Sequence, residues 1–168
     1  MQMFVLDPNP KISASNLCDV HIRVICREVT MLLSSWYHWN LPDTRSFLPY
    51  KPMNENQPLA KQMEFIPVRR WAIEFAGHVF DEFEYRFHKP HASRVRYQQL
   101  LDIIDKYDPD LRAGRLSVRF TFVAKGDGIF PGKTMSQAVW LYRAYYRHKI
   151  KTMSVPVVYT GRQPPAWL

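Results

Sequence analysis

Apolar residues recur with helical spacing between residues 17 and 38, and this pattern predicts the first long helix of the chain. At 100° per residue, a stripe about 80° wide collects apolar side chains: Cys18, Ile22, Ile25, Val29, Leu32 and Trp36. The far side is polar and holds Asp19, Arg23, Arg27, Thr30 and Ser34. We therefore expect an amphipathic helix that has Ser13 or Ser15 as its N-cap and ends near His38.

Three further segments have helical spacing. The first runs from Pro67, whose fixed φ suits the first turn of a helix, to Lys89, and its aromatic residues are expected in the core rather than on a base-stacking surface. The second runs from His91 or Ala92 to Tyr107, with Val95, Leu100, Leu101 and Ile104 directed inward and Arg94 and Arg96 outward. The third runs from Met135 to Lys151, with Ser136 as a candidate cap.

The remaining segments are irregular or extended. Residues 1–6 predict a short extended segment against the helices, residues 40–67 a long proline-rich connection, and residues 116–123 a short strand or extended loop. The tail from Val155 is expected to be extended and docked through Trp167. The fold class expected is mainly α: a single compact domain over residues 1–168, with about four helices, long irregular loops and at most a short strand or hairpin.

The charge balance is strongly basic, because 23 Lys and Arg face 15 Asp and Glu, for a formal charge of +8. Such an excess favours a polyanionic partner, of which nucleic acid is the commonest. A membrane surface is the rival partner, but the sequence has no run of 18 apolar residues and no secretory leader, so no membrane association is expected. We expect a soluble monomer in the cytoplasm.

The cysteines and the absence of known motifs limit the chemistry further. Cys18 and Cys26 are eight residues apart on the first helix, about 12 Å along its axis and too far for a disulfide. They are expected to be reduced core thiols, as in a cytoplasmic protein. The sequence contains no zinc ligand set, no P-loop and no dinucleotide-binding glycine pattern, so no metal or cofactor is expected.

Two ionisable residues share one flank of the first helix. His21 and Glu28 are two turns apart, about 10 Å along the axis and within about 20° of each other, where the apolar stripe meets the polar face. An imidazole and a carboxylate so placed are candidates for proton transfer. Periodicity alone favours the alternative, a solvated surface Glu and a boundary His.

Basic residues form a second candidate feature on the last helix. Arg143, Arg147 and Lys151 follow each other at four-residue intervals, and Tyr142, Tyr145, Tyr146 and His148 flank them. Basic residues interleaved with aromatic ones suit a DNA backbone with splayed bases. A solvated charged face above packed tyrosines is an equally good explanation. Arg94 and Arg96 stand near a helix N-terminus, where cations oppose the helix dipole, so they are candidates for phosphate contacts.

The first helix resembles that of the phage pyrimidine-dimer DNA glycosylases of the endonuclease V type. These proteins carry Leu-Ala-Asp-x-His followed by Arg-Glu at the spacing that Leu17-Cys18-Asp19-Val20-His21 and Arg27-Glu28 have here. The resemblance extends along the chain to a group of phage proteins of similar size with the same label. Its further counterparts are Phe4-Val5-Leu6, Asn56-Gln57-Pro58, the run from Glu82 to His91, Tyr142-Arg143-Ala144-Tyr145-Tyr146 and Pro165-Ala166-Trp167. Gln57, Phe83 and His88 replace the His, Tyr and Gly of that group.

The resemblance implies a reaction and a set of site residues. The family's α-amine attacks C1′ of a damaged nucleotide and forms an imine, with a catalytic Glu assisting. Carried over by position, Glu28 is the catalytic carboxylate, Met1 supplies the amine because Gln2 blocks removal of the initiator, and His21 has a lesser role. A desolvated Lys11 or Lys89 is an alternative nucleophile. Candidate DNA contacts are Arg23, Arg27, Arg86, Lys89, Arg94, Arg143, Arg147 and Lys151.

Three functions follow from these observations. The first is a base-excision enzyme, a DNA glycosylase and AP lyase, whose partner is double-stranded DNA with a flipped or damaged pyrimidine. The second is a transferase that modifies a pyrimidine in phage DNA on the same fold. The third is a non-catalytic DNA-binding or host-directed protein on an inherited scaffold. If the chain is phage-encoded, the compartment is the cytoplasm of the host cell.

Overall fold

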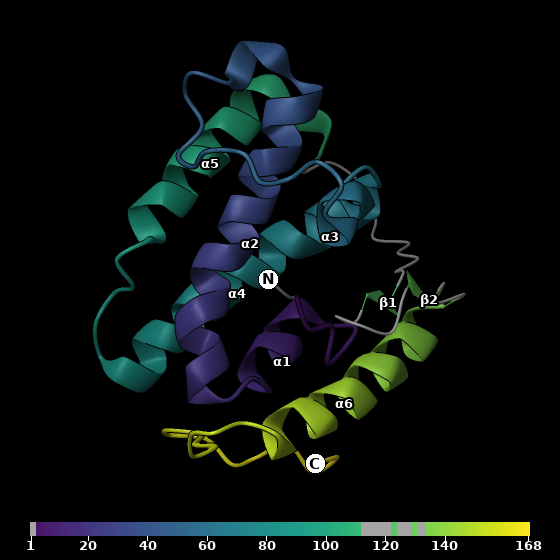
Figure 1. Ribbon diagram of the computed structural model, residues 1–168. Helices are drawn as coiled ribbons and strands as arrows, with labels where there is room; N and C mark the ends of the chain where they lie inside the picture. Colours follow the sequence, from purple (N-terminus) through teal and green to yellow (C-terminus); the bar gives the residue numbers. More distant parts are fainter. Residues whose placement is uncertain (1–2, 112–121, 124–128, 131–133) are drawn as a thin grey trace.

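Two long helices form the centre of the molecule. In the computed structural model, which describes residues 3–111, 122–123, 129–130 and 134–168, helix α2 (Asp19–Asn40) packs chiefly on helix α4 (Ile66–Phe87) (Figure 1). The short helix α1 (Pro10–Ser15) also packs on α4, and α5 (Arg94–Tyr107) contacts α2. The described chain is mainly helical, as the sequence predicts.

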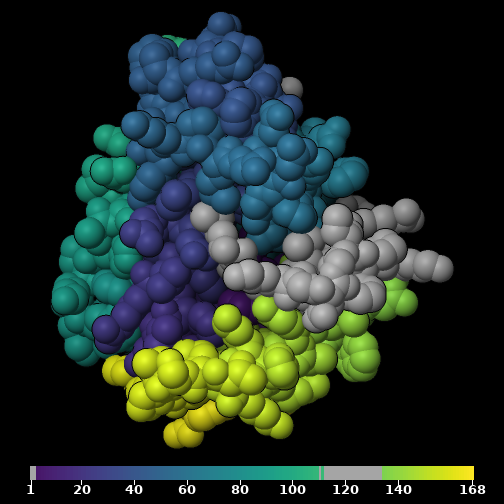
Figure 2. Space-filling model, in the orientation of Figure 1, coloured from purple at the N-terminus to yellow at the C-terminus, as the bar shows by residue number. Residues whose placement is uncertain are grey.

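Apart from the long helix α6 (Met135–Lys151), the remaining elements are short. They are two 3-10 turns, η1 (Pro42–Thr44) and η2 (Pro109–Leu111), the five-residue helix α3 (Pro58–Gln62), and the antiparallel pair β1 (Phe122–Val123) and β2 (Ile129–Phe130). Helix α6 and the segment after it lie along one edge of the molecule (Figure 2).

The core is one continuous cluster to which the start of the chain contributes. Met3, Phe4, Val5 and Leu6 are at most 2% exposed, and they pack with the apolar sides of α2, α4, α5 and α6. The expected extended segment at the start of the chain is thus present from Met3 onward, and Trp167 near the end also packs against the core. One hydrophobic core that takes side chains from both ends of the chain defines a single compact domain.

Three of the four long helices begin and end close to the predicted residues. The helices α4 and α6 match their predicted ranges to within two residues, and α5 begins two or three residues later than predicted. Residues 40–67 form the expected irregular connection, interrupted by η1 and α3. Of the predicted strand over residues 116–123, only Phe122–Val123 lie within the described residues.

The first predicted helix is wrong at its start. It is divided into α1 and α2 by a break at residues 16–18, and neither serine is its cap: the hydroxyl of Ser13 instead accepts from Leu6 N and donates to Phe4 O. Cys18 stands at the N-cap of α2 without a side-chain bond. The first amides of α2 donate instead to Tyr146 Oη and to Val158 O, so later parts of the chain complete this helix end.

Two further expectations about exposure are wrong. Thr30 and Ser34, on the polar side of α2, are fully buried, and their hydroxyls donate to the carbonyls four residues earlier, which satisfies them inside the core. Val95, expected to point inward, is 67% exposed because it stands in the first turn of α5, on the side that faces away from the core.

Candidate functional site

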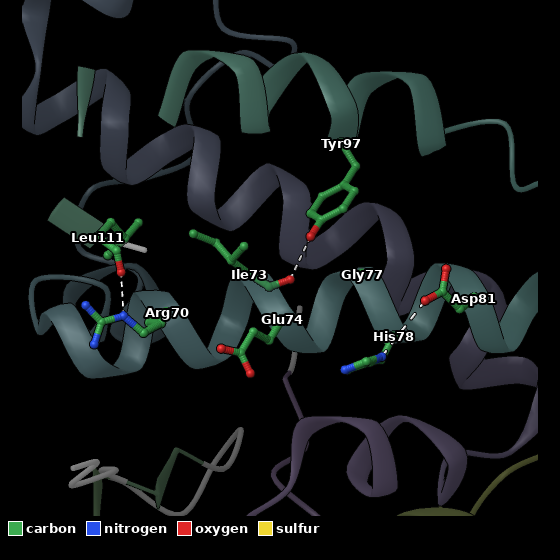
Figure 3. Close-up of a pocket in the computed structure, with 8 residues that line it drawn as sticks. All are labelled: Arg70, Ile73, Glu74, Gly77, His78, Asp81, Tyr97 and Leu111. Carbon is green, nitrogen blue, oxygen red and sulfur yellow. Dashed lines mark hydrogen bonds and ion pairs between the residues drawn. The ribbon is translucent and has the colours of Figure 1, made fainter. Parts of the chain in front are cut away.

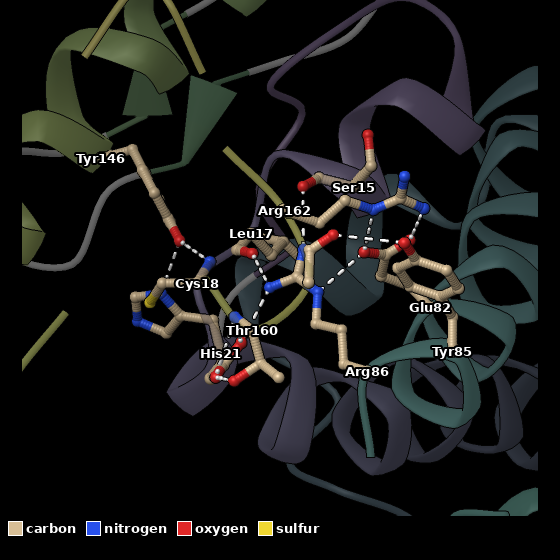
Figure 4. Close-up of polar contacts among 12 residues, drawn as sticks. Ser15, Leu17, Cys18, His21, Glu82, Tyr85, Arg86, Tyr146, Thr160 and Arg162 are labelled. Carbon is tan, nitrogen blue, oxygen red and sulfur yellow. Dashed lines mark hydrogen bonds and ion pairs between the residues drawn. The ribbon is translucent and has the colours of Figure 1, made fainter. Parts of the chain in front are cut away.

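Several residues of the motifs quoted for the resemblance meet where α2 begins. Arg86 of α4 is fully buried there, and its guanidinium donates to Glu82 at 2.7 Å and to Asp19 at 3.0 Å (Figure 4). The same guanidinium donates to the carbonyls of Leu17 and Ser15 at 2.8 and 2.9 Å, which fixes the break between α1 and α2. A buried arginine with this many partners holds helices together.

The segment after α6 completes this cluster of charges. Thr160 donates its hydroxyl to Asp19 at 2.6 Å, and Arg162 donates to both carboxylate oxygens of Glu82 at 2.9 Å. Burial opposes ionisation of both carboxyl groups, but hydrogen bonds from Thr160 and Arg86 outweigh it and lower the pKa of Asp19. Bonds from Arg162 and Arg86 lower the pKa of Glu82 in the same way. Both carboxylates are therefore ionised and fully used in the fold.

A second polar cluster lies at the same end of α2, around His21. The hydroxyl of Tyr146 accepts a bond from the Cys18 amide at 2.8 Å and lies 2.9 Å from Nδ1 of His21 (Figure 4). Burial, followed by the charge of Lys149, lowers the pKa of His21 to about 4, so the imidazole is neutral at pH 7. Burial also raises the pKa of Tyr146. The thiol of Cys18 lies 3.3 Å from the same nitrogen, so the hydroxyl of Tyr146 and this thiol both contact Nδ1 of His21.

The start of the described chain packs on this histidine. The ring of Phe4 lies 5.1 Å from that of His21 and 4.8 Å from that of Tyr146. The carbonyl of Leu6, two residues later, accepts a 2.7 Å bond from Arg143 of α6. The N-terminal segment is therefore held between the start of α2 and α6.

The other predicted catalytic residues occupy different positions. Glu28 is half-buried on α2, two turns beyond His21 on the same flank. Met1 lies outside the described residues. The alternative nucleophiles Lys11 and Lys89 are both exposed. The structure therefore brings His21 and the segment from Met3 together at one end of α2, with Glu28 farther along the same helix.

The predicted DNA-contacting residues divide into two groups. Arg23, Arg27, Lys89 and Lys151 are exposed, and Arg94 is half-buried in an ion pair with Asp81 at 2.7 Å. Of the other three, Arg86 cannot contact DNA, because its guanidinium is buried. Arg143 binds Leu6 O and Asp7, and Arg147 donates to Trp167 O, but both side chains remain partly exposed. These two residues of the predicted basic stripe on α6 therefore fasten the two ends of the chain, and their contact with DNA stays a prediction.

Sequence reasoning missed the partners that define both clusters. In the sequence, Tyr146 stands out only beside the basic stripe and in one motif of the resemblance, and nothing marks Thr160 or Arg162. Tyr146 lies 125 residues from His21, Thr160 lies 141 residues from Asp19, and Arg162 lies 80 residues from Glu82 along the chain, and no periodicity reports contacts over such separations. The resemblance is the signal for the other members, because several of its motif residues converge on this region.

A separate cavity of about 300 Å³ lies along α4, under α5 (Figure 3). It is lined by both charge signs, with Arg70 donating to Leu111 O, and His78 standing 3.9 Å from Asp81. Tyr97 closes it from α5 by donating to Ile73 O at 2.8 Å. This cavity shares none of its lining residues with the two clusters.

Two kinds of feature are absent from the described residues. Within them, no group of three or more His, Cys, Asp or Glu side chains is placed to hold a metal ion. In the same part of the chain, no helix has the length and apolar character needed to cross a membrane. Both cysteines are buried and free, as expected, and burial raises the pKa of Cys26 to about 12.

Comparison with protein-family models, with curated proteins and with solved structures finds no match for this chain.

Proposed function

We propose that this protein is a DNA-binding base-excision enzyme, a glycosylase with AP lyase activity. In the proposed reaction the N-terminal amine bonds to C1′ of the damaged nucleotide as the base leaves with the electrons of the glycosidic bond, and the nitrogen then loses a proton. Cleavage of the C1′–O4′ bond, with a proton going to O4′, opens the sugar and leaves the protonated imine. Glu28 is the carboxylate that assists opening of the sugar and the later strand cleavage. An α-amine suits this step because its pKa of about 7.7 to 8.0 leaves a sizeable neutral fraction at pH 7.

The packing of the N-terminal segment on α2 is the observation that carries the proposal. Phe4 contacts His21, and Glu28 stands on the same flank of α2, about 10 Å farther along the helix. The start of the chain and the proposed carboxylate therefore belong to one region of the molecule. The exposed side chains of Arg23 and Arg27 provide positive charge on the same helix, as a partner with phosphates requires.

The backbone at the end of α4 also supports the resemblance. His88 has a φ of 52°, in the left-handed region that favours glycine, and the phage group has Gly at this position. The glycine of the motif suits the backbone conformation found at this helix end, so the match extends from the sequence to the backbone geometry.

The test combines imine trapping with two variants. Borohydride should trap a covalent complex with abasic and dimer-containing duplexes, and acetylation of the N-terminal amine should abolish both the complex and strand cleavage. Glu28→Gln should reduce cleavage by about two orders of magnitude, because it removes the charge and the proton acceptor. Glu84→Gln, at an exposed glutamate of α4, is the matched control and should cleave normally. Cleavage at full rate by the acetylated protein or by Glu28→Gln would refute the mechanism.

One observation favours a second candidate, a non-catalytic DNA-binding protein. Several of the matched motif residues, among them Glu82, Arg86, Tyr146 and Trp167, hold the fold together, as they would on an inherited scaffold. A protein that binds duplex DNA yet neither traps nor cleaves it would support this candidate. Transfer of a group to a pyrimidine without strand cleavage would instead support the modifying transferase.

A further inference from the structure

An open groove of about 630 Å³ lies at the far end of α2, away from the two clusters. Its walls are the last turns of α2, the segment 45–52 after η1, and the start of α5 (Figure 1). The lining residues are Met31, His38, Arg45, Leu48, Pro49, Tyr50, Lys51, Pro52 and Arg96. None of these nine described residues is acidic.

Three of the lining side chains carry positive charge at neutral pH: Arg45, Lys51 and Arg96, all of them exposed. His38 does not add a fourth, because burial and the neighbouring charge of Arg45 lower its pKa. The charges come from three places in the sequence and are spread around an open groove rather than directed at one point. A row of phosphates fits this distribution better than a single small anion does.

The two arginines are held in place by the groove's own backbone. Arg45 donates through Nε to His38 O at 2.9 Å, and Arg96 donates through one terminal nitrogen to Pro49 O at 3.2 Å. The guanidinium of Arg96 also lies 4.8 Å from the ring centre of Tyr50. Each of these contacts leaves further N–H donors of a planar guanidinium on an exposed side chain, and partial immobilisation reduces the entropy lost on binding a phosphate.

The groove continues a row of positive charge on α2. Arg23, Arg27, Met31 and His38 lie within about 80° of one another around the helix and span about 22 Å along it. Arg27 stands one turn before Met31, which lines the groove, and Glu28 borders the same row. The row and the groove together have the length of about six phosphates on one strand of a duplex.

We propose that this groove binds the phosphate backbone of duplex DNA beyond the nucleotide that Glu28 faces. The inference rests on the proposed function for the identity of the polyanion, and it assigns Arg45, Lys51 and Arg96 as phosphate contacts. The DNA then follows α2 from the end near His21 to the end near His38. The proposed path does not involve the cations on α6.

The test measures the salt dependence of binding to an undamaged duplex. The variant Arg45→Gln/Lys51→Gln/Arg96→Gln should lower the slope of log affinity against log salt by about two to three units, because each phosphate contact contributes about 0.9. The control Lys61→Gln/Lys106→Gln/Lys149→Gln removes the same net charge from exposed positions elsewhere and should change the slope by less than about one unit. Melting temperatures of both variants establish that they are folded.

The results of these measurements distinguish failure of the groove proposal from failure of the proposed enzyme activity. Equal slopes for the two variants would overturn the groove proposal. If the wild type still forms the trapped imine, the proposed enzyme activity is unaffected by that result. A lower slope for the groove variant alone would support the groove proposal. If the wild type also forms no trapped imine, the proposed enzyme activity is refuted. A wild type that binds no duplex at low salt, or that binds RNA or anionic vesicles in preference to it, would overturn the groove proposal.

Discussion

His21 shows how a single residue can be identified from sequence while its role is not. The helical pattern and the resemblance both draw attention to it, and they suggest a group that exchanges protons. Its position between Phe4 and Tyr146 instead keeps the imidazole neutral and fixes its orientation. Asp19 is similar: the sequence places it on the polar side of α2, but Arg86 and Thr160 make it a buried ion. Polarity predicts a need for partners, which can be met inside the protein.

Buried, neutral His21 predicts that acid destabilises the protein in a defined range. The pKa is 6.5 when unfolded and about 4 when folded, so between these values the unfolded chain binds the additional proton. The free energy of unfolding should therefore fall as the pH drops from 6.5 to 4, by up to about 3 kcal/mol. Urea unfolding at several pH values measures this loss.

A non-titrating variant isolates the contribution of this residue. In His21→Gln the decline over the same pH range should be smaller, whereas His38 and His91 remain in both proteins and their contributions cancel in the comparison. Asp19 and Glu82, whose pKa values are lowered, add a separate loss at still lower pH. Parallel curves for wild type and His21→Gln would contradict the assignment.

Secondary-structure elements with strong periodicity were predictable, and their ends were less so. The pattern of α4 and α6 identified both helices, because their apolar faces are long and uninterrupted. The start of α2 was not predictable, since its first amides bond to Tyr146 and to Val158 rather than to a local side chain. The basic groove was also beyond prediction, because Arg45 and Lys51 lie in a segment without periodicity.

The cap of α6 gives a prediction at the level of one helix. Thr134, not the predicted Ser136, accepts from Gln137 N at 3.2 Å, and the side chain of Gln137 accepts from Thr134 N at 3.0 Å. Thr134→Ala should lower the free energy of unfolding by about 1 kcal/mol because this capping box is lost. Ser136→Ala, inside the same helix turn, should change it by less than about 0.5 kcal/mol. Equal effects in urea unfolding would show that the box is unimportant.

At the scale of the whole molecule, Arg86 joins parts of the chain that no local signal connects. It binds the end of α1, the start of α2 and its own helix α4, while Arg162 and Thr160 add the C-terminal segment to the same ions. The sequence predicted the overall class of fold because that depends on the number and spacing of apolar stripes. It did not predict this junction, because buried ion pairs depend on which helices meet.

Removing this arginine should be among the most damaging single changes. Arg86→Met keeps much of the volume but leaves Asp19 as a buried carboxylate with fewer partners, so the free energy of unfolding should fall by about 3 to 5 kcal/mol. Arg94→Met, which breaks the more exposed pair with Asp81, should lower it by less than about 1 kcal/mol. Comparable losses in denaturant titrations would mean that the buried network contributes little.

The fastening of both ends of the chain to one junction also bears on how the protein folds. Three hydrogen bonds, between Cys18 and Tyr146, between Leu6 and Arg143 and between Asp19 and Thr160, close loops of 128, 137 and 141 residues. Closure of such loops is entropically unfavourable until the intervening helices have already packed. We therefore expect α6 to dock late in folding, and until it does the segment from Met3 to Leu6 lacks one of the surfaces that cover it.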